Sequence, residues 1–409
     1  MIDVRLARDE PEQMRRAIAR KGAGEVFDEF IEVDAQWRQL TSAVDDLRSR
    51  TRPKGKPTAE ELRALQLLKE ELRGGESELA AMGEKRDELL RRIPNPPFEE
   101  VPDGLTDEDA TELRRAGEVP SFAFDARDHV ELGGIDMERG ARLSGSRFAY
   151  RRGPVALLEL AMYRYALDSL TELGFEVVLP PVLVKEEAMY GTGFLPNEAP
   201  NLYVLESDQL YLTGTSEVAL AALRQGEVLE AGELPLRYAG YSTCFRREAG
   251  AAGRDTRGVF RVHQFDKVEM FVFTSPEESR DEHERLLAIE ERLVSALGLA
   301  YRVVCTAAGD LGAPAAKKYD IEAWIPSQGR YREITSCSNT TDYQARRLNV
   351  RFRDPGHRLR VVHTLNGTAM TARWMIALME TFQDAAGQVA VPEVLHAYGA
   401  PRQVGVSPA

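Results

Sequence analysis

Two heptad repeats near the amino terminus constrain the fold of this chain more than any other feature of its sequence. In the first, between Phe30 and Leu47, apolar residues recur at alternating steps of three and four positions. A second repeat with the same spacing runs from Leu65 to Ile93. Residues spaced in this way form a stripe along one side of a helix and bury it against another helix. The sequence therefore predicts two long helices that pack side by side.

The segment between the repeats predicts that these two helices run antiparallel. Residues 52–57 read Arg-Pro-Lys-Gly-Lys-Pro, and both proline and glycine interrupt a helix. A turn this short joins helices that fold back on each other. Thr58 and Glu61 have the spacing of a capping box at the start of the second helix. Counting outward from the turn, we expect Trp37 to lie near Gly75, which would leave room for the indole ring.

Positive charge is concentrated at the turn of this predicted hairpin. Basic residues gather there in a stretch without acids, whereas the helices behind them carry many acids. A coiled-coil arm is by itself more often a dimerisation zipper or a spacer, and that alternative stays open. A basic tip on a projecting arm, however, suits a phosphate backbone. We therefore expect the arm to bind RNA through Arg48, Arg50, Arg52, Lys54 and Lys56.

Length and net charge restrict the class of protein. With 409 residues the chain is long enough for one large domain and a smaller one, and an apolar fraction of 43% supports a buried core. The formal net charge of −13 argues against a surface coated for nonspecific nucleic-acid binding. Any contact with RNA is therefore expected from local basic patches.

The cysteines and the amino terminus favour a cytoplasmic protein. Cys244, Cys305 and Cys337 are far apart and odd in number, which does not suit a disulfide framework. The histidines show no metal-ligand spacing, so we expect no zinc site. The first residues, Met-Ile-Asp-Val-Arg, lack the apolar core of a signal peptide. No apolar run approaches the roughly 18 residues of a membrane span, so we expect no membrane partner.

Beyond the arm, the sequence predicts a second domain of the α+β class. Residues 1–105 would form the helical arm, with the coiled-coil hairpin at about 28–93 and the basic tip at 48–56, and residues 106–121 would form a linker. From 122 to 409, strand-like and helix-like runs alternate without a regular βαβ order. This order favours a mixed, mainly antiparallel sheet with flanking helices over a doubly wound parallel sheet.

Several arginines converge on one predicted hairpin in this second domain. Residues 241–246 and 259–273 are rich in Tyr, Phe and Val and read as strands, while the glycine-rich residues 249–255 read as a turn. Arginine suits bidentate contact with phosphate, and a neighbouring aromatic ring offers a base a surface to stack on. An edge hairpin with merely solvated arginines is the alternative. The pattern favours a nucleotide site built from Arg246, Arg247, Arg254, Arg257 and Arg261.

The residues of this hairpin resemble a known family. Phe245-Arg246-Arg247-Glu248, followed by Arg261 and by His263-Gln264-Phe265, is similar to motif 2 of the class II aminoacyl-tRNA synthetases. The run as far as Glu269 looks specifically like that of a seryl-tRNA synthetase. This resemblance implies a class II catalytic domain at 122–409 and a tRNA-binding arm at 1–105. The predicted helix 154–173 and the strand after it resemble motif 1, which implies a homodimer.

The resemblance also implies roles for individual residues. The catalytic residues would be Arg246, Glu333 and Arg373. ATP would contact Arg246, Arg247, Glu248, Arg261, Val262, His263, Phe265, Glu333, Ile334, Thr335, Ser336 and Arg373, and Mg²⁺ would be held by Glu333 and Ser336. L-Serine would contact Thr215, Ser216, Glu217, Arg246, Glu269, Asn366 and Thr368. We expect Thr215, Ser216 and Glu217 to lie on a strand.

The implied reaction is ATP-dependent activation of L-serine to seryl-adenylate, followed by transfer to the 3′ end of a tRNA(Ser) held by the arm. Two alternatives stay open. The arm tip and residues 129–136 and 369–372 depart from the family pattern, which favours a specialised paralogue that activates serine or an analogue for antibiotic self-resistance or biosynthesis. An inactive RNA-binding scaffold is the other alternative, and the presence of Arg246, Glu333 and Arg373 argues against it.

Overall fold

The computed structural model describes residues 1–52, 58–249, 255 and 257–406, and it divides into two compact units. The first unit is Met1–Pro97 and the second is Phe98–Ala409. In the described residues no helix combines the length and the apolar character that crossing a bilayer requires. The predicted arm residues Lys54 and Lys56 lie outside the described residues, as does Arg254 of the arginine hairpin.

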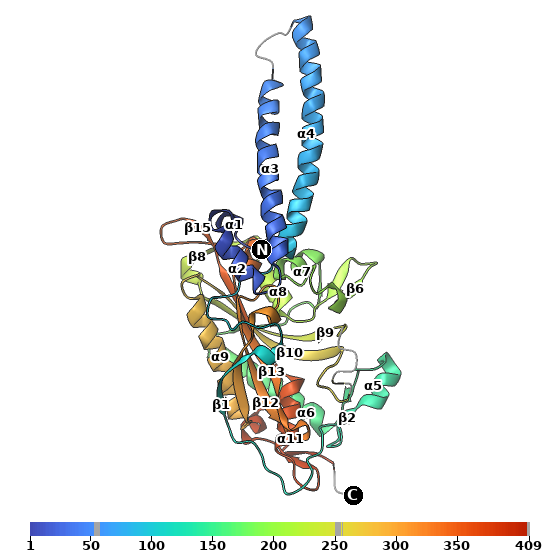
Figure 1. The fold of residues 1–409 in the computed structure, drawn as a ribbon. Coiled ribbons are helices and arrows are strands. Elements are labelled where there is room, and N and C mark those ends of the chain that lie inside the picture. Colours follow the sequence, from blue (N-terminus) through green and yellow to red (C-terminus); the bar gives the residue numbers. More distant parts are fainter. Residues whose placement is uncertain (53–57, 250–254, 256, 407–409) are drawn as a thin grey trace. The chain divides into compact units, whose positions relative to one another are not determined.

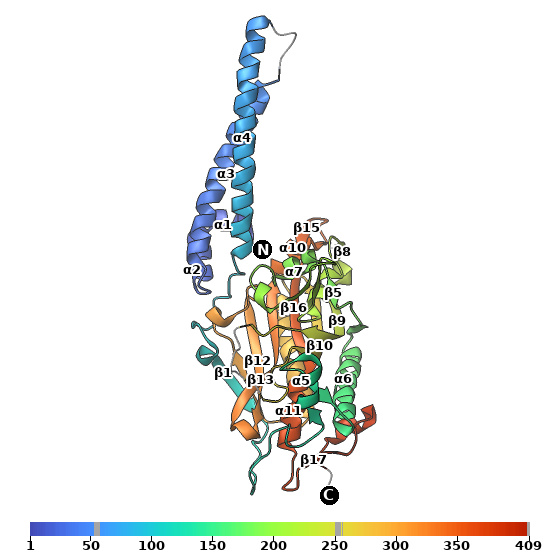
Figure 2. The same ribbon diagram turned by 90° about the vertical axis from the view of Figure 1, so that its right-hand side faces the viewer.

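The first unit is a helical arm, as the heptad repeats predict. Two long helices, α3 (Gly24–Arg50) and α4 (Ala59–Arg92), lie side by side in both Figure 1 and Figure 2, and they are preceded by α1 (Val4–Asp9) and α2 (Pro11–Ala19). The predicted capping box is confirmed: the Thr58 N–H donates to Glu61 Oε2 at 2.7 Å, and the Glu61 N–H donates to Thr58 Oγ1 at 3.3 Å.

The predicted pairing of Trp37 with Gly75 is wrong. A Cβ on Gly83 would lie 3.3 Å from Trp37 Nε1, whereas a Cβ on Gly75 would lie 3.2 Å from Val44 Cγ2. Glycine does make room for the indole, but the glycine is the one two turns further along α4. The shift arises because α3 already ends at Arg50 while α4 continues past it at the tip (Figure 1).

A buried ion cluster joins the helices at the base of the arm. Asp34, only 1% exposed, accepts from Arg8 Nε and Nη2 at 2.8 Å and from Arg86 Nε at 2.7 Å. Burial acts to raise the pKa of Asp34, but the hydrogen bonds from the two arginines outweigh it and lower the pKa. The Arg86 guanidinium carbon also lies 4.9 Å from the ring centre of Trp37. These contacts explain how Arg86 can occupy a position in the otherwise apolar stripe of α4.

The second unit is built on one large sheet, so the predicted α+β class with a mainly antiparallel sheet is confirmed. Neighbouring strands are antiparallel except at one edge, where β4 and β9 are parallel. Within the described residues the spatial order is β1 (Thr111–Ala116), β11 (Tyr301–Cys305), β12 (Lys317–Ile325), β13 (Arg330–Thr341), β16 (His363–Thr371), β10 (Gln264–Thr274), β9 (Leu236–Phe245) and β4 (Glu176–Val178).

Helices cover both faces of this sheet, and strand alternation decides which side chains each face receives. On β10, Val268 and Met270 point into the main core, whereas Phe271 belongs to a second cluster on the opposite face. The main core lies against α6 (Pro154–Glu172), α9 (Ser279–Ala296) and α11 (Ala372–Thr381). The opposite face carries α7 (Glu186–Thr192), α8 (Glu217–Ala222) and α10 (Tyr343–Leu348).

Smaller elements complete the unit around the large sheet. Helix α5 (Met137–Ser144) lies between β2 (Ile135–Asp136) and β3 (Tyr150–Arg151), which pair with each other. The other small sheets are β5 (Leu183–Val184), β7 (Leu210–Leu212) and β6 (Tyr203–Leu205); β15 (Leu359–Val361), β14 (Arg351–Arg353) and β8 (Val228–Glu230); and β17 (Gln388–Ala390) with β18 (Gln403–Gly405).

Two segments differ from the sequence-based expectation. Residues 106–121, predicted as a linker, contain the edge strand β1, which pairs with β11. This strand reads Thr-Glu-Leu-Arg-Arg-Ala and is mostly exposed, so it lacks the apolar alternation that reveals a strand. The strand predicted at 259–273 begins only at Gln264, and residues 259–262 line the pocket described next instead.

Candidate active site

A pocket of about 520 Å³ opens on the face of the large sheet that carries α8 and α10, and we call it the central pocket. Its floor comes from β10, β13 and β16, and its walls include residues at the start of α8 and α11. The predicted site residues that line it are Thr215, Glu217, Arg246, Glu248, Arg261, Val262, Phe265, Glu269, Glu333, Ile334, Thr335, Ser336, Asn366, Thr368 and Arg373. Segments far apart in the sequence therefore meet in one cavity.

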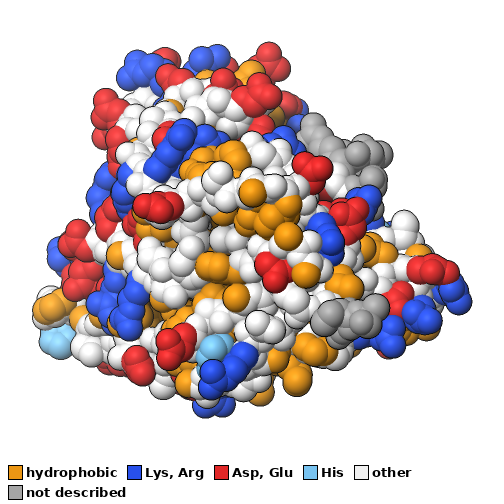
Figure 3. All heavy atoms as spheres, turned by 90° about the horizontal axis from the view of Figure 1, so that it is seen from below, with side chains coloured by type: hydrophobic (Ala, Val, Ile, Leu, Met, Phe, Trp, Pro, Cys, Tyr) orange, Lys and Arg blue, Asp and Glu red, His pale blue; other side chains and the backbone are white. Residues whose placement is uncertain are grey.

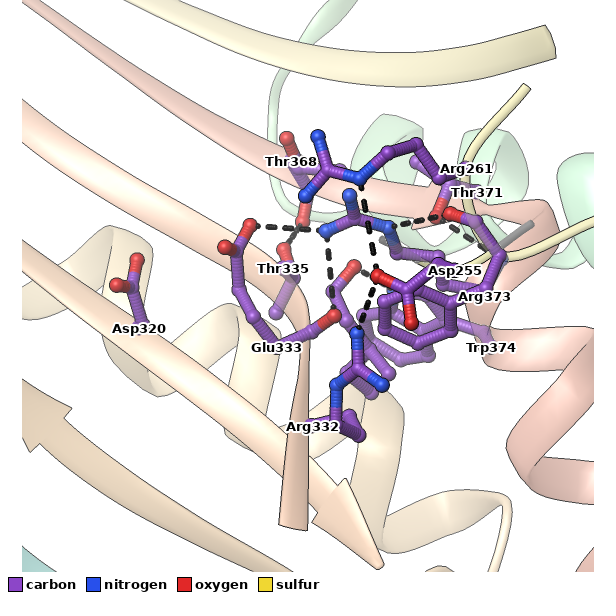
Figure 4. A network of polar contacts seen from close by, with 12 residues as sticks. Asp255, Arg261, Asp320, Arg332, Glu333, Thr335, Thr368, Thr371, Arg373 and Trp374 are labelled. Atoms are coloured by element: carbon purple, nitrogen blue, oxygen red, sulfur yellow. Dashed lines mark hydrogen bonds and ion pairs between the residues drawn. The ribbon is translucent and has the colours of Figure 1, made fainter. Parts of the chain in front are cut away.

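Arginines from separate segments line one end of the central pocket (Figure 4). Arg261 Nη1 donates to Glu248 Oε2 at 2.5 Å. Arg373, the second residue of α11, donates from Nη1 to Glu333 Oε1 at 3.1 Å. Each guanidinium group is thus held by a carboxylate while it faces the cavity. Such a surface suits the oxygens of a polyphosphate.

The ring of Phe260 organises the same end of the pocket. The guanidinium carbons of Arg332 and Arg373 lie 4.0 and 4.8 Å from its centre, which is within cation–π range. The Phe260 carbonyl oxygen accepts from Arg373 Nε at 3.3 Å. Arg332 is held from its other side by Asp255, whose Oδ2 lies 2.8 Å from Arg332 Nη2.

Arg246 extends from the end of β9 to the middle of the pocket. Its Nε donates to the carbonyl oxygen of Gly214 at 3.0 Å. Its guanidinium carbon lies 5.4 Å from the ring centre of Phe265. The arginine end of the pocket therefore has both a fixed cation and an aromatic surface close to it.

Carboxylates line the other end of the pocket, and one of them, Glu217, is held by amide groups. Its Oε1 accepts from Gln344 Nε2 at 2.7 Å and from Asn366 Nδ2 at 3.0 Å. Burial and then the nearby charge of Glu269 raise the pKa of Glu217 to about 7. A carboxylate in this condition is a favourable partner for a cationic ligand.

Glu269 lies on β10 with a cation beside it. Its Oε2 forms a short ion pair with Lys267 Nζ and accepts from Thr368 Oγ1 at 3.4 Å. Burial raises the pKa of Glu269, and Lys267 opposes that shift. The Thr368 carbonyl oxygen in turn accepts a short hydrogen bond from Thr335 Oγ1, which joins β16 to β13.

Glu333 and Ser336 on β13 could hold a divalent cation. Nearly half of the Glu333 side chain, 46%, is exposed, and the residue lines the pocket. Burial acts to raise the pKa of Glu333, but Arg373 and Lys318 outweigh it and lower the pKa. One ionised carboxylate and one hydroxyl fit Mg²⁺, which takes its other ligands from phosphates and water. Among the described residues no three His, Cys, Asp or Glu side chains come together as a metal cluster.

Four predicted residues lie outside the described lining of the pocket, and one of them, Arg257, is paired with Asp128 at 2.7 Å instead. Ser216 Oγ donates to the Gly240 carbonyl oxygen at 3.3 Å. Arg247 Nε donates to the Leu202 carbonyl oxygen at 2.9 Å, and His263 Nδ1 donates to the Arg246 carbonyl oxygen at 2.9 Å.

Thr215, Ser216 and Glu217 do not lie on a strand, so that expectation is wrong. Strand β7 ends at Leu212, Ser216 is the N-cap of α8, and Glu217 is its first residue. The Glu217 N–H donates to Thr215 Oγ1 at 3.2 Å. This local hydrogen bond turns the chain into a helix, which is a common effect of threonine and serine.

Several residues in or next to the pocket were not predicted from the sequence. Lys267 could have been found, because it lies two positions before Glu269 and thus on the same face of its strand. Phe260, Lys318 and Gln344 carry no comparable signal, since their contacts with the site arise only in the folded chain.

Comparison with known proteins agrees with this geometry over the full chain. Residues 1–97 match the family described as "Seryl-tRNA synthetase N-terminal domain", and residues 203–382 match "tRNA synthetase class II core domain (G, H, P, S and T)". The serine–tRNA ligase of Leifsonia xyli is 49% identical over 411 residues, which cover 97% of each chain. This chain belongs to the seryl-tRNA synthetase family.

Other members of the family are similar in sequence and in structure. The serine–tRNA ligase of Streptomyces coelicolor is 45% identical over 421 residues, covering 99% of each chain. The structure of the seryl-tRNA synthetase from Pyrococcus horikoshii complexed with ATP covers both chains fully, with a TM-score of 0.93 and 38% identity. The structure of the Naegleria fowleri cytoplasmic enzyme with AMP has a TM-score of 0.89 and 33% identity, and it covers 100% of this chain and 99% of that one.

We expect Glu217→Gln to stabilise this seryl-tRNA synthetase family member at pH 8 much more than at pH 5. The pKa of Glu217 is about 7 in the folded protein, against a reference of 4.5. The folded state thus retains a proton that the unfolded chain loses, and stability falls as the pH rises between these values. Glutamine does not ionise, and its amide oxygen can still accept from Gln344 and Asn366. The gain at pH 8 is on the order of 2–3 kcal/mol.

Urea denaturation at both pH values measures this effect. Glu187→Gln, a change at an exposed position on α7, serves as the control and should alter stability little at either pH. The same change in stability for Glu217→Gln at pH 5 and pH 8 would contradict the expected ionisation.

Proposed function

We propose that this protein activates L-serine with ATP and transfers the seryl group to tRNA(Ser). The observation that supports this most is that the central pocket joins an arginine end to a carboxylate end. Phosphates fit the first, and the ammonium and hydroxyl groups of serine fit the second. The relatives named serine–tRNA ligase and the solved relative complexed with ATP agree with this proposal.

The carboxylate end would select serine. The serine ammonium would pair with Glu217, whose Oε1 also accepts from Gln344 and Asn366. The serine hydroxyl would donate to Glu269, which Lys267 keeps from being an uncompensated buried charge. Alanine has no hydroxyl and would leave Glu269 without that hydrogen bond. A site built for a hydroxyl rejects such analogues strongly.

The arginine end would bind ATP and drive the first step by positioning and charge stabilisation. A serine carboxylate oxygen attacks the α-phosphorus, the bond between that phosphorus and the bridging oxygen breaks, and pyrophosphate leaves with its electron pair. Arg246 would stabilise the charge on the α-phosphate, and Arg261 and Arg373 would hold the leaving pyrophosphate. Adenine would stack on Phe265, beside Val262 and Ile334.

The second step needs no nucleophile from the protein. A terminal hydroxyl of tRNA attacks the acyl carbon of seryl-adenylate, its proton leaves, and AMP departs as the ester forms. Mg²⁺, when bound at Glu333 and Ser336, would neutralise charge on the phosphate oxygens. We expect both steps to take place in the cytoplasm.

Pyrophosphate exchange into ATP tests the proposed function. Exchange is expected with serine and not with alanine or threonine. Arg246→Ala should lower kcat/KM by about 10²–10³-fold, because one donor to the developing charge is lost. Arg142→Ala, on the exposed surface of α5, is the matched control and should leave the exchange unchanged.

The outcome also separates the alternatives. No exchange with serine or any close analogue would leave only an RNA-binding scaffold. Exchange with serine combined with poor charging of tRNA(Ser) would indicate the specialised paralogue instead of the ligase.

We propose that the arm holds tRNA(Ser) through its tip. Arg48, Arg50 and Arg52 lie at the end of α3 and just beyond it. Arg48 is already paired with Asp45 and Glu76 at 3.0 Å, and Arg50 is paired with Asp46 at 3.4 Å. These pairs are about half exposed, and exposed pairs are weak enough to yield to a phosphate.

Replacing Arg48, Arg50 and Arg52 together by glutamine should weaken tRNA binding and leave serine-dependent exchange without tRNA intact. Each lost phosphate contact lowers the slope of log Kd against log salt by about 0.7–0.9. Filter binding over a series of salt concentrations measures that slope. The matched triple change at Arg139, Arg142 and Arg152 removes the same charge elsewhere. An equal loss of affinity in both triple variants would rule out a specific role of the tip.

We propose that the protein is a homodimer through α6 and the neighbouring sheet edge. Leu157 and Leu160 on α6 are 53% and 58% exposed, and Leu179 after the edge strand β4 is 76% exposed. Figure 3, which views the molecule from below, shows hydrophobic side chains interspersed with charged ones on that face. An apolar surface on an open sheet edge is typical of a subunit interface.

Sedimentation equilibrium tests the dimer. The wild-type protein should have about twice the mass of one 45.7 kDa chain. Leu157→Asp combined with Leu160→Asp should shift it to the monomer, while Leu105→Asp, at a leucine that is 73% exposed, should not. A monomeric wild-type protein would overturn the proposal.

A further inference from the structure

We propose that His129 is a positioning residue for ATP. It holds the return limb of the arginine hairpin, residues 257–262, against α11. This inference rests on the proposed function of the central pocket. His129 lies in a segment that joins two sides of the arginine end without lining the pocket itself. Its role follows from three sets of contacts, made by its ring, by the glycine that packs on the ring, and by the residues on either side.

The ring of His129 connects the hairpin to α11 directly. It is 4% exposed, and Nδ1 lies 2.8 Å from Glu380 Oε1 on α11. The Val259 N–H donates to Nε2 at 3.2 Å. Because Nε2 accepts this hydrogen bond, the ring proton resides on Nδ1 and is donated to Glu380. The imidazole is therefore neutral and satisfied at both nitrogens.

Glu380 is itself fixed, so the ring is held in one orientation. Its Oε1 also accepts from the backbone N–H of His129 at 3.1 Å, and its Oε2 accepts from the Ser327 N–H at 3.0 Å. The carboxylate is fully buried. A buried acceptor with these donors leaves little freedom to the histidine that it orients.

Gly258 allows the hairpin to approach the ring. Its φ is +77°, and a Cβ at this position would lie 2.0 Å from His129 Nε2. Both the backbone conformation and the space therefore require glycine. The backbone of the return limb thus packs directly on the imidazole, next to the Val259 N–H that donates to it.

The residues beside His129 hold the same two structures. Arg257 of the return limb forms ion pairs with Asp128 and Glu131, both at 2.7 Å. On the side of α11, the Arg127 N–H donates to Gln383 Oε1 at 2.8 Å, and Gln383 Nε2 donates to the Arg127 carbonyl oxygen at 2.9 Å. The segment 127–131 therefore forms a brace between the return limb and α11.

The brace fixes the relative position of two phosphate-facing arginines. Arg261 follows Val259 by two residues on the return limb, and Arg373 lies about two turns before Glu380 on α11. Phe260, between Val259 and Arg261, accepts from Arg373 Nε and packs on its guanidinium group. In the part of the chain that the structure describes, the carboxylate end makes no hydrogen bond or ion pair with His129: Glu217 and Glu269 are held by Gln344, Asn366, Lys267 and Thr368. Loss of the brace should thus affect ATP and spare serine.

His129→Leu removes both ring hydrogen bonds and tests the proposal. We expect the Kd for ATP, measured by calorimetry, and the KM for ATP in serine-dependent exchange to rise about 10–100-fold. The KM for serine should stay within about twofold. His129→Gln, whose amide can still donate and accept, should recover part of the affinity for ATP. If His129→Leu does not fold, Gly258→Ala disturbs the same contact from the hairpin side.

His396→Leu is the control for the loss of a half-buried histidine, because among the described residues the ring of His396 is hydrogen-bonded only to the Val391 carbonyl oxygen. It should lower the melting temperature without changing the affinity for ATP.

An unchanged affinity for ATP in His129→Leu, or an equal rise of the KM for serine, would overturn the inference. Failure of the proposed function would differ from failure of this inference, because the wild-type protein itself would then show no exchange. Calorimetry with ATP still decides the inference in that case, and a wild-type protein that binds no ATP overturns it.

Discussion

The active site depends on the balance between its carboxylates and the cations around them. Glu269 is paired with Lys267 and Glu333 with Arg373, whereas Glu217 is held by two amides and its pKa rises to about 7. An isolated buried charge is costly, so the site is complete in charge only when a cation reaches Glu217. The ammonium group of an amino acid is such a cation. Under the proposed function, substrate binding and charge compensation would therefore be the same event at this end of the pocket.

The arginine end uses the opposite arrangement. Its guanidinium groups are already oriented by carboxylates and by the ring of Phe260. Phosphate oxygens would meet cations whose side chains are largely ordered, so less conformational entropy is lost on binding. The strands under both ends belong to one sheet, and this common floor would set the distance between a bound nucleotide and an amino acid.

Features with a local physical cause could be predicted from the sequence. The heptad spacing predicted α3 and α4, the Thr58 capping box predicted where α4 begins, and the motif-like runs identified most of the charged residues that line the pocket. The register of Trp37 could not be predicted, because it depends on how far α4 extends past α3. Strand β1 is polar, and its pairing with β11 places it at the edge of the sheet. Phe260 and His129 gain their roles from partners that are distant in sequence.

The unequal lengths of α3 and α4 imply a gradient of local stability along the arm. At the base, Phe27, Phe30 and Leu90 are buried and Asp34 is locked by arginines. Towards the tip, Leu62 and Leu67 of α4 are 49% and 69% exposed, beyond the end of α3. A stretch of helix with so little buried surface is only marginally stable and opens at a lower free energy than the base. The end of the arm can thus unwind and reform while the base stays folded, which would let it adapt to the shape of a bound RNA.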